Sequence, residues 1–445
     1  MKYRSTRESS TSVRIGDAIR NGAAPDGGLY VPERVPAADV AALRKIDSLA
    51  EFAPRFLQPF FAEDPLAEEL PAICREAFDF PAPIVTSDPA RPELRALELF
   101  HGPTGAFKDF GAQFLMACFD RLGDPERPLT VLVATSGDTG GAVGCAAEGR
   151  KAVQAGILFP KGRVSPFQEL QLTCWDAPVH AFEVEGDFDD CQRMVKAAFA
   201  DRELSQSLRL TSANSINIGR LLPQAAYLAF AAIRVFAETG APPGFIIPTG
   251  NLGHGFAALY ARQMGVPIGP IVAATNANRT LIEWHESGQY APRPSIATIA
   301  NAMDVGAPSN FERLMYLPEA AREIDVQLID DKTIRERIKI EYQRRNYPSN
   351  VPLRYVWDPH SATAAEAFAR MSDAQRGKRT WIACATAHPY KFADVVEPVI
   401  GSKITPPAAL EAIFGRTAHK QTIAPSLGAL ARELRKVFGA ARANV

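Results

Sequence analysis

From about residue 95 onward, the chain alternates short apolar runs with longer segments of helical periodicity, which restricts the folds that it can adopt. The apolar runs have the length of buried strands, and the segments between them repeat apolar residues at helical spacing. Strands and helices that alternate in this way form parallel sheets covered by helices on both faces. We therefore predict an α/β fold with ligand-binding loops at the carboxyl ends of the strands. The expected strands span residues 94–100, 130–134, 156–159, 179–185, 245–248, 268–275 and 380–385.

Residues 1–95 lack this alternation and indicate a separate, mainly helical N-terminal region. Residues 46–61 and 66–80 carry apolar residues at near-helical spacing. Prolines at positions 81, 83, 89 and 92 mark an irregular connection to the first expected strand. The rest of the chain, residues 96–445, contains the strands and the helices that alternate with them. Those helices are expected over residues 107–121, 142–147, 187–200, 220–239, 255–264, 333–345 and 363–371.

The composition is that of an ordinary soluble globular protein and excludes several classes of partner. The 445 residues are 47% hydrophobic and 22% charged, and a net charge of −1 gives no basis for binding nucleic acid or an anionic membrane. No uninterrupted apolar run is long enough to span a bilayer, and residues 1–7 lack the apolar core of a secretory signal. The six cysteines form no C-x-x-C pair and the seven histidines form no H-x-x-x-H pair. We therefore expect no metal site, no disulfide framework and a cytoplasmic protein.

One lysine, Lys108, lies among glycine and aromatic residues in the segment HGPTGAFKDF, residues 101–110. A mostly apolar pocket disfavours the charged form of a lysine, so its amine becomes available as a nucleophile. The ordinary alternative is a surface lysine, but a cation at a helix start opposes the helix dipole and gains nothing there. The later segment TSGDTGG, residues 135–141, follows an expected strand and opens an alanine-rich helix, where backbone N–H groups can bind an anion. A Schiff-base lysine and an anion site together fit pyridoxal phosphate.

These residues resemble the threonine synthase family, and the resemblance extends over nearly the whole chain in the expected order. Besides HGPTGAFKDFG and TSGDTGG, the matching motifs are PDGGLYVPE (25–33), NSINIGR (214–220), PTGNLGHG (248–255), NAMDVGAPSN (301–310) and TAHPYKF (386–392). The resemblance implies fold type II of the pyridoxal phosphate enzymes, which is like that of tryptophan synthase β. In that fold, two open sheet-containing subdomains, here within residues 96–445, hold the cofactor in the cleft between them.

The same resemblance implies an activity and a substrate. The family catalyses the last step of threonine biosynthesis and converts O-phospho-L-homoserine and water into L-threonine and phosphate. The chain would then be a pyridoxal-phosphate-dependent carbon–oxygen lyase that acts on a small molecule as a monomer or a homodimer. Two rival functions remain open. One is a threonine or serine dehydratase or another β-eliminating relative, and the other is a non-catalytic protein that binds phosphorylated ligands.

The resemblance also assigns cofactor-binding roles to particular residues. Lys108 is the Schiff-base lysine, Asp138 faces the 3-hydroxyl of the cofactor, and Thr386 contacts the pyridine nitrogen. The loop expected to hold the cofactor phosphate consists of Gly250, Asn251, Leu252, Gly253 and His254. The family more often has Phe at the position of Leu252, a change that a cup of backbone N–H groups tolerates. The structural alternatives are a helix cap for Asp138, a backbone-bonded hydroxyl for Thr386 and a simple turn for the loop.

Five further residues are expected to bind the substrate, namely Ser136, Thr139, Asn214, Asn217 and Arg220. Ser136 and Thr139 offer hydroxyl and N–H groups to a carboxylate or a phosphate. Two asparagines and an arginine within seven residues suit a second anion, because a guanidinium matches two phosphate oxygens. The resemblance implies that this anion is the phosphate of O-phosphohomoserine. The alternative is that the Asn and Ser residues cap the long helix that follows.

Overall fold

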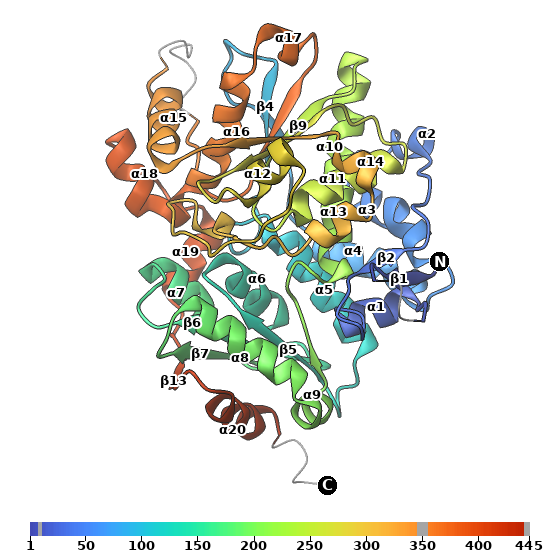
Figure 1. Ribbon diagram of the computed structural model, residues 1–445, viewed down its shortest axis with the longest axis vertical. Coiled ribbons are helices and arrows are strands. Elements are labelled where there is room, and N and C mark those ends of the chain that lie inside the picture. Colours follow the sequence, from blue (N-terminus) through green and yellow to red (C-terminus); the bar gives the residue numbers. More distant parts are fainter. Residues whose placement is uncertain (8–10, 345–354, 440–445) are drawn as a thin grey trace.

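Two open sheets form the framework of the protein (Figure 1), and the computed structural model describes residues 1–7, 11–344 and 355–439. The larger sheet has six strands in the order β11-β10-β9-β12-β4-β3. Among the described residues, its neighbouring strands pair in parallel except for β3 and β4, which are antiparallel. The six strands are β3 (Ile84–Thr86), β4 (Leu94–Glu98), β9 (Gly244–Pro248), β10 (Ile271–Thr275), β11 (Ile324–Leu328) and β12 (Trp381–Ala385).

The smaller sheet has five parallel strands in the order β13-β7-β6-β5-β8. Its strands are β5 (Leu129–Ala134), β6 (Val153–Pro160), β7 (Val179–Val184), β8 (Leu210–Thr211) and β13 (Gln421–Ile423). Strand β13 comes from the C-terminal part of the chain and is followed by helix α20 (Leu427–Phe438), so that end returns to the smaller sheet (Figure 1). The two sheets confirm the predicted α/β fold.

Both faces of the larger sheet are buried because successive residues of its strands enter different cores. On β9, Phe245 and Ile247 pack in a core with helices α10 (Ile218–Thr239) and α11 (Gly253–Gln263), whereas Ile246 packs in a core with α16 (Pro359–Arg370). A strand buried on both faces needs apolar residues at every position, which explains the continuous apolar runs of the sequence.

The smaller sheet is covered in the same way, and one of its faces joins the core just described. On β5, Val131 and Val133 belong to the core of α10 and α11, which also includes residues of α5 (Lys108–Leu122) and α6 (Asp138–Ala147). The neighbouring Leu132 packs in a separate core with α8 (Phe188–Ala200) and α20. A single core therefore extends from one sheet to the other.

Helix α10 is long and apolar enough to cross a membrane by length and composition alone. In the structure, 72% of its most apolar 18-residue window is buried inside the protein. It packs against α3 (Leu49–Leu57), α5 and α11. Its apolar character is therefore explained by its place in the core.

The N-terminal part of the chain packs against the outer side of α5 and α10 (Figure 1). It contains α1 (Ile15–Asn21), α3 and α4 (Leu66–Ala77), and a two-stranded antiparallel sheet of β1 (Tyr3–Ser5) and β2 (Tyr30–Pro32). Strand β3 already pairs with β4 of the larger sheet, so this sheet begins before residue 95. The boundary between the N-terminal region and the rest of the chain at residue 95 stays a prediction.

The remaining helices connect these elements or cover their ends. They are α2 (Val40–Leu43), η1 (Gln58–Phe61), α7 (Pro166–Thr173), α9 (Arg202–Leu208), α12 (Thr280–Ser287), η2 (Asn301–Met303), α13 (Phe311–Met315), α14 (Pro318–Ala321), α15 (Asp331–Gln343), α17 (Asp373–Arg376), η3 (Pro389–Phe392), α18 (Ala393–Ile400) and α19 (Ala408–Phe414). The end predicted for the helix at residues 333–345 lies outside the described residues.

Candidate active site

A cavity of about 1090 Å³ opens at the carboxyl ends of strands β5, β9 and β12. The loops that follow these three strands line it, together with the start of α5 and the segment before α10. Every expected site residue except Asn217 lines this cavity. The fold therefore brings together residues from position 108 to position 386 where parallel strands end, as ligand-binding loops of open α/β sheets generally do.

Lys108 is the first residue of α5, and the loop before it is held in place by hydrogen bonds to the chain around Thr386. The N–H of Phe107 donates to the carbonyl oxygen of Thr386 at 2.8 Å, and the N–H of His388 donates to that of Gly105 at 2.9 Å. Gly105 has a φ of +69°, a conformation that favours glycine. These contacts fix the direction in which Lys108 leaves the helix.

The ammonium of Lys108 lies beside a carboxylate and faces the cavity, with only 14% of its side chain exposed. Its Nζ is 3.4 Å from Oδ2 of Asp138. Burial lowers the pKa of Lys108 from its ordinary value, the charges of Lys391 and Arg220 lower it further, and Asp138 opposes the change. The net lowering favours the neutral amine that nucleophilic chemistry requires.

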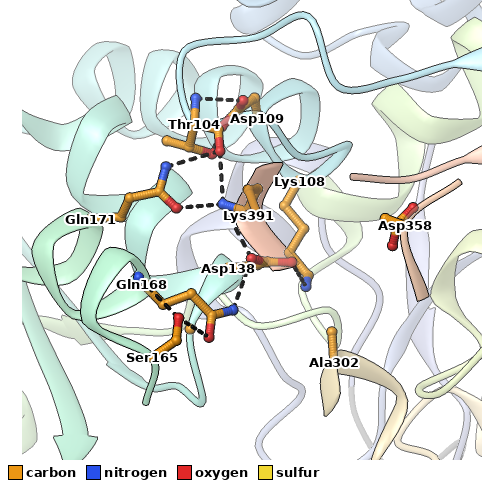
Figure 2. Close-up of polar contacts among 12 residues, drawn as sticks. Thr104, Lys108, Asp109, Asp138, Ser165, Gln168, Gln171, Ala302, Asp358 and Lys391 are labelled. Carbon is orange, nitrogen blue, oxygen red and sulfur yellow. Dashed lines mark hydrogen bonds and ion pairs between the residues drawn. The ribbon is translucent and has the colours of Figure 1, made fainter. Parts of the chain in front are cut away.

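Asp138 is the first residue of α6, and its carboxylate contacts side chains rather than capping the helix. One oxygen faces Lys108, and the other lies 3.2 Å from Nζ of Lys391 and accepts from Nε2 of Gln168 at 3.4 Å (Figure 2). Burial would raise the pKa of Asp138, but the Lys391 and Lys108 cations outweigh it and hold the pKa well below its usual range. Asp138 is therefore an anion at physiological pH.

The turn before Asp138 requires glycine at position 137. Gly137 has a φ of +148°, and a Cβ there would lie 2.6 Å from Nε2 of Gln168. The hydroxyl of Thr135 accepts from the N–H groups of Gly137 and Gly140, both at 3.0 Å. This turn places Asp138, Ser136 and Thr139 along the cavity wall.

Sequence reasoning missed Lys391, which is fully buried on η3 and contacts Asp138. It belongs to the motif TAHPYKF, which carried part of the family resemblance, so the available signal was a lysine in a matching motif with no assigned role. It also missed Gln168 and Gln171 on α7, a helix that the sequence pattern did not predict. All three side chains reach the site from segments remote in sequence from Lys108 (Figure 2).

The glycine loop at residues 250–254 follows β9 and opens α11, as expected for an anion-binding turn. A Cβ on Gly250 would lie 2.9 Å from Cα of Met303, so only glycine lets these backbones approach. Oδ1 of Asn251 accepts hydrogen bonds from the backbone N–H and the hydroxyl of Ser309. Leu252 has a left-handed backbone with a φ of +63°, and the N–H groups of the first turn of α11 begin directly after it.

His254 is a buried imidazole of the same loop that packs between two aromatic rings. Its ring stacks on Phe107 at a centroid distance of 4.9 Å and meets the edge of Tyr227 at 5.6 Å. Neither ring nitrogen has a hydrogen-bond partner among the described residues. Burial lowers the pKa of His254 to about 3, so the ring is neutral at physiological pH.

Arg220 lies in the first turn of α10, buried beside the cavity. Its Nη1 donates to the carbonyl oxygen of Ala213, whereas Nε has no hydrogen-bond partner among the described residues. Gly111 of α5 makes room for it, because a Cβ there would lie 2.8 Å from Nε of Arg220. Asn214 lines the cavity from the same segment. A buried guanidinium that lacks a carboxylate partner suits an anionic ligand.

Asn217 does not line the cavity, unlike the other expected residues. Its amide donates to the carbonyl oxygens of Ile19 and Ser212 and accepts from the N–H of Gly219. These three bonds cap α10 and connect it to α1 of the N-terminal region. The structure thus places the Asn217 side chain at the helix cap, which is the alternative to substrate binding.

Thr386 follows β12 directly and lines the cavity with little exposure. Its backbone N–H donates to the hydroxyl oxygen of Ser361 at 2.8 Å, and its carbonyl oxygen accepts from the N–H of Phe107. Ser361 lies in the first turn of α16, which Asp358 caps through the N–H groups of His360 and Ser361. Hydrogen bonds therefore connect the end of β12 with α16 and with the loop before Lys108.

Family profiles and relatives cover the whole chain. The pyridoxal-phosphate dependent enzyme family matches residues 79–386, the threonine synthase N terminus matches residues 2–78 and the threonine synthase C-terminal family matches residues 361–432. Threonine synthase from Serratia marcescens is 36% identical over 447 aligned residues, which include 98% of this chain and 98% of that protein. The chain belongs to the threonine synthase family.

Solved structures of the threonine synthase family have the same fold. Threonine synthase from Escherichia coli aligns with a TM-score of 0.87 and 32% identity over 98% of this chain and 100% of that one. The pyridoxal-phosphate-bound threonine synthase from Brucella melitensis aligns with a TM-score of 0.88 and 34% identity over 98% of this chain and 99% of that one. These findings confirm fold type II and pyridoxal phosphate as the cofactor.

The residues around the cavity fit pyridoxal phosphate. Lys108 offers an amine whose pKa is lowered, and two helix N-termini, those of α6 and α11, open toward the cavity. Gly250 and Gly253 have no side chain in the loop that opens α11, so its backbone N–H groups can approach a phosphate closely. Arg220 and His254, which have side-chain nitrogens without a hydrogen-bond partner in the described part of the chain, both line the cavity.

Proposed function

We propose that this protein converts O-phospho-L-homoserine and water into L-threonine and inorganic phosphate, with Lys108 as its catalytic residue. The observation that supports this most directly is the buried Lys108–Asp138 pair beside a cavity that has two regions whose residues suit anions. One region is the glycine loop of residues 250–254, and the other contains Arg220 and Asn214. An enzyme with a phosphorylated cofactor and a phosphorylated substrate needs both.

Lys108 has two tasks in this proposal. Its amine would hold the cofactor in the resting enzyme, and the same amine would be free once the substrate is bound. Its free amine then removes the α-proton of the substrate and returns a proton later. When bound, pyridoxal phosphate supplies the electron-withdrawing ring that makes loss of this proton possible.

The other cofactor-binding roles follow from position. We assign the cofactor phosphate to the backbone N–H groups of Gly250, Asn251, Leu252, Gly253 and His254 at the start of α11. Asp138, held ionised by two lysines, faces the 3-hydroxyl, and Thr386 contacts the pyridine nitrogen from the end of β12. Both residues line the cavity beside Lys108.

We assign Ser136, Thr139, Asn214 and Arg220 to the substrate. The hydroxyl and N–H groups of Ser136 and Thr139 suit its carboxylate, whereas Arg220 and Asn214 suit its phosphate. For Asn217 we propose a positioning role, because its amide ties the start of α10 to the N-terminal region. A substrate whose carboxylate and phosphate are both bound in this way would keep water away from its reacting carbons until phosphate has left.

An assay for phosphate and threonine with O-phosphohomoserine tests this proposal against its rivals. We expect both products in equal amounts from the wild type and neither from Lys108→Ala, while Lys332→Ala, which changes an exposed lysine of α15, stays active. Circular dichroism shows whether Lys108→Ala keeps its fold. 2-Oxobutyrate as the sole product would support a dehydratase, and no turnover with no cofactor taken up would support a binding protein.

We place this biosynthetic enzyme in the cytoplasm as a monomer or a homodimer. Light scattering after size-exclusion chromatography distinguishes the two assemblies.

A further inference from the structure

A second buried lysine lies on the far side of Asp138 from Lys108. The side chain of Lys391 has no exposed surface, and its Nζ is 3.2 Å from Oδ1 of Asp138. The same ammonium donates to the carbonyl oxygen of Thr104 at 2.7 Å and to Oε1 of Gln171 (Figure 2). Three acceptors match the three N–H groups of an ammonium. Lys391 is therefore held in one position by three contacts.

Asp138 is shared between the two lysines, one on each oxygen. Oδ2 faces Lys108 at 3.4 Å, and Oδ1 faces Lys391 at the shorter distance of 3.2 Å. The two lysines differ in their surroundings, because Lys108 reaches the cavity whereas Lys391 has no access to it. One carboxylate thus contacts a lysine that reaches the cavity and a lysine that is fully buried.

The charges around this group are few and can be named. Lys108 faces Asp138, Lys391 and Arg220, and Asp138 also faces His360. Lys391 further faces His388, whose pKa burial lowers to about 4, and Asp109, whose pKa burial raises to about 6. Since His388 is neutral at physiological pH, Asp138 and Asp109 are the anions that determine how Lys391 acts.

An isolated pair of Lys108 and Asp138 would oppose catalysis. A carboxylate beside a buried amine favours the ammonium, which has no lone pair to attack an aldehyde carbon. Condensation of the amine with an aldehyde would replace the C=O bond by a C=N bond, and the aldehyde oxygen would leave as water with both amine hydrogens. The amine must therefore be neutral when the reaction begins.

We propose that Lys391 is a positioning residue that balances the charge of Asp138, so that Lys108 is not held as the cationic half of an isolated ion pair. This inference rests on the role proposed above for Lys108. It goes beyond that role because it assigns a purpose to a residue that never touches the substrate. Lys391 acts on Lys108 by neutralising Asp138 and through its own positive charge, which lowers the pKa of Lys108.

Reactivity of Lys108 in the cofactor-free, full-length protein tests the inference without measuring turnover. Acetylation by trace acetic anhydride, followed over a range of pH and mapped by mass spectrometry, reports the neutral fraction of Lys108. We expect Lys391→Met to slow acetylation of Lys108 about tenfold near neutral pH, because a nearby positive charge is lost. The exposed Lys332 serves as an internal reference and should react at the wild-type rate.

A second substitution separates charge from structure. If Lys391 acts by balancing Asp138, the double variant Lys391→Met with Asp138→Asn removes both charges and should return the reactivity of Lys108 to near the wild-type rate. Lys391→Met that folds and leaves the rate unchanged would overturn the inference. If Lys391→Met does not fold, Asp138→Asn alone decides, because it should speed acetylation of Lys108, and an unchanged rate would count against the proposal.

The role of Lys108 itself is tested separately. The wild-type protein is incubated with pyridoxal phosphate, reduced with borohydride and digested, and the labelled lysine is identified. A label on any residue other than Lys108 would contradict the proposed function whatever Lys391 does. A label on Lys108 together with unchanged reactivity in Lys391→Met would contradict the inference about Lys391 alone.

Discussion

Single side chains in this cavity owe their chemistry to burial and to the charges beside them. Asp138 and Asp109 are both buried carboxylates, yet their pKa values move in opposite directions. For Asp138 two lysines outweigh the cost of burial, whereas for Asp109 burial outweighs the hydrogen bonds from Thr104. The sequence predicted that Lys108 and Asp138 serve the same cofactor, but Lys391 arrives through packing between segments far apart in the chain.

Arg220→Met should weaken use of O-phosphohomoserine more than binding of the cofactor. The substitution removes a buried guanidinium with a free Nε but keeps most of the side-chain length. A hydrogen bond to a charged group contributes about 1.5–3 kcal/mol, so we expect KM to rise about tenfold to a hundredfold. Steady-state kinetics and cofactor titration measure the two effects.

The control for Arg220 lies on the same helix. Arg234 of α10 pairs with Asp47 on the exposed side, so Arg234→Met should leave both KM and cofactor affinity unchanged. Loss of cofactor with an unchanged KM in Arg220→Met would instead place this arginine at the cofactor phosphate.

His254→Phe should make the cofactor-free protein less sensitive to acid. The pKa of His254 is lowered from 6.5 to about 3 by burial, so its contribution to stability is present above pH 6.5 and is lost as pH falls toward 3. Between neutral pH and about pH 5 this loss amounts to about 2 kcal/mol. Phe keeps the stacking on Phe107 but does not titrate.

Urea unfolding at the two pH values measures this effect as the difference in the free energy of unfolding. The exposed His419 provides the matched control, since His419→Phe should keep the wild-type pH dependence. An equal loss of stability at about pH 5 in the wild type and in His254→Phe would show that another group causes it.

At the scale of elements, the sequence predicts secondary structure best where one strand is followed directly by one helix. The apolar run, glycine turn and helix start of β5–α6 and β9–α11 are continuous in sequence, so local pattern defines them. Strands β3, β8 and β13 have only two or three residues and show no periodicity, so only pairing with distant strands forms them. Helix α20 was missed although Leu430, Leu434 and Phe438 lie at helical spacing on its buried face.

The site residues divide in the same way. The glycine loop and Lys108 follow from motifs, because each depends on a short stretch of backbone. The placement of Asn217 does not follow from its motif, because an asparagine before a helix can either bind an anion or cap the helix. Its hydrogen bond to the carbonyl oxygen of Ile19, far away in sequence, favours the cap.

Gly250→Ala should weaken cofactor binding through the loop that contains it. A Cβ at this position would lie 2.9 Å from Cα of Met303 and 3.2 Å from Cγ2 of Val305, so a backbone segment must move. Overpacking of this kind costs about 1–3 kcal/mol, and we expect the Kd for pyridoxal phosphate to rise about tenfold. Gly415→Ala meets no atom within 4 Å and should match the wild type. An unchanged Kd in Gly250→Ala would remove this loop from the cofactor site.

At the scale of the whole molecule, the cavity lies between parts that one core connects. Residues of β5 from the smaller sheet, β9 from the larger sheet and α3 from the N-terminal region pack in the same core with α5 and α10. Arg313 adds a polar connection, because its guanidinium donates to the carbonyl oxygens of Tyr30, Ser215 and Ile216. The N-terminal region is thereby tied to the segment that contains Asn214 and Arg220.

We therefore expect the two sheets and the N-terminal region to unfold together in one transition. If the sheets had separate cores, each could lose structure alone, and two transitions would follow. Trp381 on β12 reports on the larger sheet, and Trp175 after α7 reports on the smaller one. Replacing Trp284, Trp357 and one of these two by Phe gives a matched pair of single-tryptophan proteins. Their fluorescence transitions in urea should coincide with each other and with loss of helix by circular dichroism, and transitions at different urea concentrations would show that the sheets are independent.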